Sequence, residues 1–159
     1  MRHVRPMLEK ELDFVNEARN SERCSRDLRD DSSVANIPEV LWEVTSARVM
    51  TTEFIRGLKG DSSFVPGLHC CCAVTDLEGL RKAGISTRDV AHAIITVFGH
   101  QIFCTGFIHA DPHAGNLLVR KYKGGKEVEL ILLDHGLYLE LNNEHRRMLC
   151  EFWKAVVYR

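Results

Sequence analysis

The sequence predicts an α+β fold built around a single hydrophobic core. Its 159 residues are 45% hydrophobic, and a chain of this size can bury the core of one domain. Three segments place apolar residues at helical spacing, and two short apolar runs flank the Gly-Gly pair at 124–125, a pattern typical of a β-hairpin. Helices and short strands in one chain together indicate the α+β class.

The first predicted helix lies in PMLEKELDFVNEARNSE, residues 6–22, where apolar residues follow Pro6 at helical spacing. Glu11, Asp13 and Glu17 crowd on its polar side. Carboxylates at i and i+4, such as those of Asp13 and Glu17, repel each other on a helix. This acidic face is either a solvated surface or a place where one carboxylate awaits a cation or a metal ion.

Two β-rich runs follow, Val40–Val44 and Arg48–Ile55, and their spacing around Thr-Ser-Ala predicts an antiparallel hairpin. Residues 60–73, GDSSFVPGLHCCCA, have neither helical nor strand periodicity and predict a surface loop. Ser86 then forms a capping-box pattern with Asp89, which predicts the start of a long helix.

That long helix carries a wide apolar stripe, which predicts burial on two sides, and Gly106 is expected to end it. Residues 143–158 predict a further amphipathic helix. The stripe of the long helix consists of Val90, Ala91, Ile94, Ile95, Val97, Phe98 and Ile102.

The Gly-Gly hairpin brings two polar residues together. Asn116 precedes its first strand and Asp134 follows its second, and each lies nine residues from Gly125. If the strands pair about Gly124 and Gly125, Asn116 and Asp134 end side by side. A carboxylate and an amide oxygen at one place form a hard oxygen site that suits Mg²⁺.

The loop FIHADPHAGNLLV, residues 107–119, carries the pattern His109-x-Asp111-x-x-x-x-Asn116. Together with Asp134-x-Gly136 after the hairpin, it has the spacing of the catalytic and metal loops of protein kinases. Phosphoryl transfer needs one aspartate to orient the acceptor, and an asparagine with a second aspartate to hold Mg²⁺.

Zinc ligation by His109, His113 and His135 is the weaker hypothesis. The first two flank a proline and do not have the helical i, i+4 geometry of zinc proteases. His113 is then interpreted as a hydrogen-bonding loop residue, and His135 as a packing residue between Asp134 and Gly136.

The motifs HADPHAGN, DHG and ELDFVNEARN resemble the ABC1/UbiB family of atypical kinases, also called aarF-domain-containing kinases, and in particular its animal mitochondrial members of unassigned substrate. The resemblance extends over nearly the whole chain, and Ala114 stands where the family usually has proline. It implies a protein-kinase-like fold, with residues 1–56 as a partial N-lobe and hinge (glutamate helix and hairpin). Residues 57–159 then form a mainly helical C-lobe with the catalytic β-hairpin.

The resemblance also implies the roles of individual residues. Asp111 matches the catalytic aspartate, and His109 belongs to the same loop. Asn116 and Asp134 match the ligands that hold Mg²⁺ on ATP. The remaining matches are Glu17 with the glutamate that pairs with a strand lysine, Glu11 and Asp13 with the E-x-D element, and Glu53 and Ile55 with hinge residues that contact the nucleotide.

Two departures from the family's pattern limit what is expected of this chain. The K-x-G-Q segment, the alanine-rich nucleotide loop and the strand lysine lie before the first helix in the family and are not in this sequence. Residues 60–73, with their triple cysteine, look inserted. The resemblance implies that the chain is part of an ATP-dependent kinase or ATPase. Because of the two departures, we expect little or no catalysis from this chain alone. The alternatives are a non-catalytic, pseudokinase-like binding fragment and a small-molecule kinase of the aminoglycoside or choline type.

Composition excludes other classes. The formal net charge is −1 with no basic block, which argues against binding to nucleic acid or to an anionic membrane surface. The six cysteines contain no Cys-x-x-Cys pair and predict free thiols in a reducing compartment. No apolar run approaches the roughly 20 residues of a membrane span. No targeting segment is recognisable, so a mitochondrial location follows from the resemblance only. The sequence does not identify the phosphoryl acceptor, which is a protein, a lipid or water. It does not identify the oligomeric state either.

Overall fold

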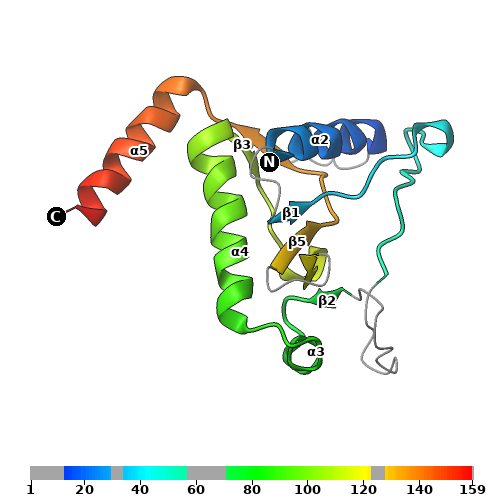
Figure 1. Cartoon of the computed structure of the whole chain (residues 1–159). Helices are drawn as coiled ribbons and strands as arrows, with labels where there is room; N and C mark the ends of the chain where they lie inside the picture. The colour runs from blue at the N-terminus through cyan, green and yellow to red at the C-terminus, as the bar shows by residue number, and fades with distance from the viewer. Residues whose placement is uncertain (1–12, 30–33, 57–70, 123–127, 159) are drawn as a thin grey trace, which may run out of the picture.

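The computed structural model of the chain describes residues 13–29, 34–56, 71–122 and 128–158 (Figure 1). Four α-helices and two small sheets form this part of the chain, in agreement with the predicted mixture of helices and strands. The helices are α2 (Phe14–Asp27), α3 (Leu77–Ala83), α4 (Thr87–His100) and α5 (Asn143–Val157). The strands are β1 (Ala35–Asn36), β2 (Cys72–Ala73), β3 (Phe107–His109), β4 (Leu117–Lys121), β5 (Val128–Leu132) and β6 (Tyr138–Glu140).

The larger sheet has the strand order β1-β5-β4-β2, and β3 pairs with β6 in a second sheet. Strands β4 and β5 are antiparallel, with Leu117 opposite Leu132 and Lys121 opposite Val128. This register is centred between positions 124 and 125, so the predicted hairpin is confirmed. All five residues of β5 are buried, because the strand lies between β1 and β4 with α4 beside it (Figure 1).

Helix α4 begins and ends where the sequence predicts. The Ser86 side chain accepts a hydrogen bond from the Asp89 amide at the N-terminus. A π-helical turn, Gln101–Thr105, extends the helix to Gly106, which adopts a φ of 72°. The predicted burial of the apolar stripe on two sides is wrong for part of that stripe, since Ile95 is 71% exposed. The buried residues Val90, Ala93 and Val97 follow a narrower face, which packs in the same core as Leu130 and Leu132.

The first described helix also differs from its prediction. Asp13 is the N-cap of α2, and its side chain accepts hydrogen bonds from the amides of Val15 and Asn16. Asp13 is therefore outside the helix, where its negative charge is favourable at the positive end of the helix dipole, so the expected helical repulsion from Glu17 is wrong. Glu11 lies outside the described residues.

The first predicted hairpin is only partly confirmed. The two segments run antiparallel through the isolated bridges Val40–Thr52 and Ser46–Val49. A 3₁₀ turn at Trp42–Val44 interrupts the first segment, and neither segment forms a regular strand. The strand of this region is instead β1, which pairs in parallel with β5.

The surface-loop prediction for residues 60–73 is wrong at its C-terminal end; residues 60–70 lie outside the described residues. Cys71 and Cys72 are fully buried, and β2 pairs Cys72 with Val119 and Ala73 with Leu118. A two-residue edge strand is too short to show a period-2 pattern of apolar residues, which explains why the sequence did not predict β2.

Helix α5 is formed as predicted and extends away from the sheets (Figure 1). None of its described residues is buried, and five of its large apolar side chains are at least 48% exposed: Met148, Phe152, Trp153, Val156 and Val157. Within the described ranges, the helices are all too short or too polar to traverse a bilayer.

Candidate active site

Asn116 and Asp134 meet at the open end of the β4–β5 hairpin. The Asn116 side-chain amide donates a hydrogen bond of 2.8 Å to Asp134 Oδ2. Next to them, the Leu133 amide donates to the Asn116 carbonyl, which closes the ladder one residue beyond the strands. Both side chains are half-buried. The predicted proximity of these two residues is confirmed.

Asp111 follows β3 in a loop that folds on itself. The Asp111 amide donates to His109 Nδ1 at 3.1 Å, and the Asp111 carbonyl accepts from the His113 amide at 2.7 Å. His113 Nδ1 in turn accepts from the Gly115 amide, as expected of a hydrogen-bonding loop residue. The Asp111 side chain is exposed, and its carboxylate makes no hydrogen bond or ion pair with a described residue.

His109 lies between the loop that carries Asp111 and the metal-ligand candidate Asp134. Its ring is 4% exposed, and this burial lowers the pKa of His109 more than the nearby Asp134 and Asp111 carboxylates raise it. The ring therefore stays neutral at physiological pH. One ring nitrogen accepts from the Asp111 amide, and the ring lies near enough to the Asp134 backbone and carboxylate for both to raise the pKa of His109. The buried imidazole thus lies next to both Asp111 and Asp134.

His135 is a packing residue, as predicted, but it also has hydrogen-bond partners. It is 1% exposed, and burial lowers the pKa of His135 to about 4. Its Nδ1 lies 2.9 Å from the Tyr138 hydroxyl and its Nε2 lies 3.2 Å from the Leu132 carbonyl. A carbonyl only accepts, so Nε2 carries the proton and Nδ1 accepts from Tyr138.

Glu17 projects from α2 toward the same loop. Its Oε1 accepts a hydrogen bond of 3.2 Å from the His135 amide. Burial raises the pKa of Glu17, the hydrogen bond from His135 opposes that shift, and repulsion from Asp134 adds to it. No lysine or arginine in the described part of the chain forms an ion pair with Glu17. One turn further along α2, Asn20 donates to the His135 carbonyl at 3.0 Å, a contact that the sequence did not predict.

The hinge candidates lie beside β4 rather than at the Asn116–Asp134 pair. The Glu53 amide donates to the Glu39 carbonyl at 2.8 Å, and the Glu53 carboxylate lies near enough to Arg120 on β4 to contribute to its raised pKa. Ile55 is half-buried in the same extended segment. Neither hinge candidate forms a described contact with Asp111, Asn116 or Asp134.

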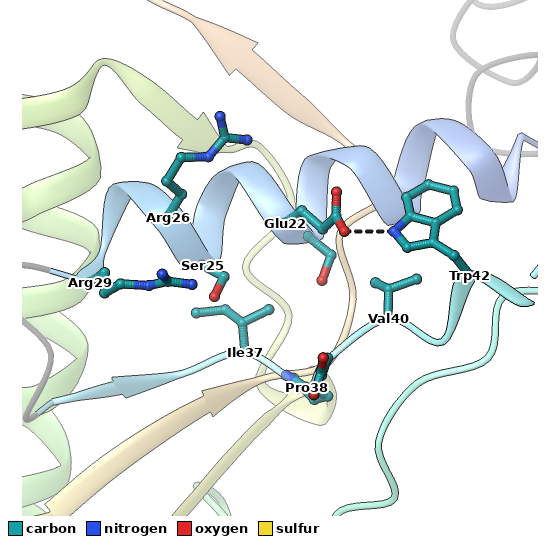
Figure 2. A pocket seen from close by; sticks show the side chains of 10 residues that line it. Glu22, Ser25, Arg26, Arg29, Ile37, Pro38, Val40 and Trp42 are labelled. Atoms are coloured by element: carbon teal, nitrogen blue, oxygen red, sulfur yellow. Dashed lines mark hydrogen bonds between the residues drawn. The ribbon is translucent and has the colours of Figure 1, made fainter.

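A cavity of about 640 Å³ lies on another side of α2 (Figure 2). It is bounded by α2 and by residues 37–42, and the indole of Trp42 closes one end by donating to Glu22 at 2.6 Å (Figure 2). None of the predicted site residues lines it, so the cavity is separate from the candidate site at the hairpin end. The zinc alternative receives no support, because the described residues contain no cluster of three or more potential ligands.

The sequence of this chain matches a known protein family. Residues 1–159 match the family described as the ABC1 atypical kinase-like domain. This chain belongs to that family. It is 42% identical over 149 residues to the probable serine/threonine-protein kinase abkB of Dictyostelium discoideum, covering 94% of this chain and 20% of that protein.

Animal proteins of the ABC1 family are similar to this chain as well. The AarF domain-containing protein kinase 1 of Xenopus laevis is 36% identical, covering 92% of this chain and 25% of that protein. The AarF domain-containing kinase 1 of Drosophila melanogaster is 35% identical with the same coverage. The chain thus spans a fifth to a quarter of the length of these ABC1 relatives.

Proposed function

We propose that this chain forms the catalytic-loop and metal-binding part of an ATP- and Mg²⁺-dependent phosphotransferase. The observation that carries the proposal is the Asn116–Asp134 contact, with the His109 ring beside it that accepts from the amide of the exposed Asp111. In the proposed lobe arrangement, α2 and the extended segment up to Arg56 belong to the N-lobe and hinge. Strands β2 to β6 and helices α3, α4 and α5 belong to the C-lobe, and β1 of the proposed N-lobe and hinge segment pairs with β5.

The residues at the hairpin end suit Mg²⁺. Asp134 offers a carboxylate and Asn116 an amide oxygen, and hard oxygen ligands are those that Mg²⁺ prefers. One bound ion would neutralise charge on the ATP phosphates. Asp134 Oδ1 already accepts from the Gly136 amide at 2.9 Å, which holds the carboxylate in one orientation. Glu53 and Ile55 are the proposed contacts to the nucleotide base.

Asp111 is the proposed catalytic aspartate. Its exposed carboxylate is available to accept a hydrogen bond from an acceptor hydroxyl, which orients that oxygen and receives its proton during transfer. The names of relatives include a probable serine/threonine-protein kinase and so favour a protein hydroxyl as acceptor. A lipid hydroxyl or water uses the same geometry, and water would make the activity an ATPase.

ATP turnover in the intact protein tests this proposal. Asp134→Ala removes a metal ligand, and Asp111→Ala removes the group that orients the acceptor, so each should lower kcat by about 10²-fold or more. Glu151→Ala on α5 is the control, since it removes an exposed carboxylate outside the site.

Turnover that resists both site substitutions would refute the assigned roles, and absence of turnover in the intact protein would favour the non-catalytic binding function. Subcellular fractionation separately tests the mitochondrial location that the family resemblance implies.

A further inference from the structure

Two side chains of α2 hold the backbone of His135 from one side. Glu17 Oε1 accepts from the His135 amide at 3.2 Å, and Asn20 Nδ2 donates to the His135 carbonyl at 3.0 Å. Residues three apart face the same direction on a helix, so one face of α2 engages both peptide groups of His135. This pairing of a carboxylate acceptor and an amide donor matches the polarity of the two backbone groups.

The His135 side chain is held from the other side. Its ring donates to the Leu132 carbonyl and accepts from the Tyr138 hydroxyl, at 3.2 and 2.9 Å. All four polar atoms of His135 therefore have partners, from three separate segments of the chain. A residue bound in this way and 1% exposed cannot shift without breaking several buried hydrogen bonds.

His135 lies between Asp134 and Gly136, so its orientation determines where the Asp134 carboxylate points. Asp134 Oδ1 accepts from the Gly136 backbone amide and Oδ2 accepts from the Asn116 side-chain amide. The His135 carbonyl belongs to the peptide group that ends at the Gly136 nitrogen. Rotation of that peptide group would move the Asn20 contact and the Gly136 donor together.

We propose that Asn20 is a positioning residue for the metal site, acting through the His135 carbonyl on Asp134. The inference rests on the proposed function, because it assigns Asn20 a part in keeping Asp134 ready to bind the metal ion. Asn20 contacts neither nucleotide nor acceptor in this role. Its amide suits the role because it donates without charge, whereas a carboxylate would repel the carbonyl.

The test compares Asn20→Ala with Asn16→Ala in the intact protein. The two positions are one turn apart on α2, and the Asn16 side chain makes no hydrogen bond with a described residue. Alanine is the best helix former, so both variants should retain α2. Two quantities are measured: hydrogen–deuterium exchange of the peptide spanning residues 132–138, and the Kd for Mn²⁺ alone, followed by electron paramagnetic resonance of the free ion.

Asn20→Ala should speed exchange at His135 and Gly136 and raise the Kd for Mn²⁺ about fivefold, which corresponds to about 1 kcal/mol. Asn16→Ala should leave both quantities unchanged. Unchanged exchange in Asn20→Ala, or faster exchange with an unaltered Kd, would overturn the positioning role. If Mn²⁺ binds wild type and Asp134→Ala with equal Kd, the proposed metal site is wrong, and the positioning role of Asn20 is wrong with it. This outcome differs from the preceding ones because it appears in Asp134→Ala and not in Asn20→Ala.

Discussion

Glu17 offers a sharp test of the electrostatics around the Asp134 loop, through the paired substitutions Glu17→Gln and Glu17→Ala. Alanine removes the acceptor of the buried His135 amide, and an unsatisfied buried donor costs about 1–3 kcal/mol. With a mid-range cost of about 2 kcal/mol, Tm should fall by about 4–8 °C for a chain of this length. Glutamine keeps an acceptor in the same place and removes a charge that is buried and repelled by Asp134, so Tm at pH 7 should equal or exceed that of wild type.

The two variants also differ in their dependence on pH. The pKa of Glu17 is raised in the folded state, so in the window above its unfolded value the folded protein binds more protons. Wild-type stability from this group is therefore fully present below the unfolded pKa and is lost as pH rises through the folded pKa. Glutamine does not titrate, so the difference in Tm between Glu17→Gln and wild type should grow from pH 4 to pH 7.

Differential scanning calorimetry across that range measures both effects in matched buffers. Glu17→Gln should separate from wild type as pH rises, while Glu17→Ala stays below wild type at pH 7. The reasoning is refuted if wild type instead gains stability over Glu17→Gln toward pH 7. That result would mean that a cation pairs with the Glu17 carboxylate, as the strand lysine pairs with the helix glutamate in protein kinases.

Three further outcomes follow from the packing. Glu129→Ala should lower the free energy of unfolding by about 1.5–3 kcal/mol in urea denaturation because it removes the hydrogen-bonded partner of the partly exposed Arg120, whereas Glu129→Leu combined with Arg120→Met should be nearly neutral. Gly106→Ala should lower the free energy of unfolding by about 1–2 kcal/mol in the same assay, because Gly106 has a φ of 72° and an added Cβ would lie 3.0 Å from a backbone carbonyl oxygen. Gly99→Ala should raise the free energy of unfolding by about 0.5–1 kcal/mol, because the space around an added Cβ is open. Cys72→Asp, which places a charge at a fully buried position of β2, should lower the free energy of unfolding by more than about 4 kcal/mol and lower the soluble yield.

The meeting of Asn116 and Asp134 at the hairpin end could be predicted because it depends only on the number of residues that separate each of them from the turn. Two strands that pair about a known turn must bring equidistant residues together, and the side-chain period of two leaves little freedom in the register. Asn116 and Asp134 met for this reason. The capping residue Ser86 and the terminating Gly106 were predictable for a similar reason, since each satisfies backbone groups within a few residues of itself.

Contacts between distant segments could not be predicted in this way. Asn20 and His135 are separated by 115 positions, and an asparagine on an amphipathic helix looks the same whether it faces water or a carbonyl. The only available signal was its i, i+3 spacing from Glu17. Cys72 was misplaced because its burial in β2 depends on pairing with β4 and not on any local pattern.

The same distinction explains how the site is built. The loops that carry Asp111 and Asp134 are fixed less by apolar packing than by buried polar groups. Gln101, which is 1% exposed in the π-helical turn, accepts from the His109 amide at 3.0 Å and donates to the Cys24 sulfur on α2. Such buried polar groups are costly unless each finds its partner, so they permit few alternative arrangements. Substitutions in this polar layer should therefore disturb the relative positions of the two aspartates before they unfold the chain, and metal affinity is the more sensitive measure of their effect.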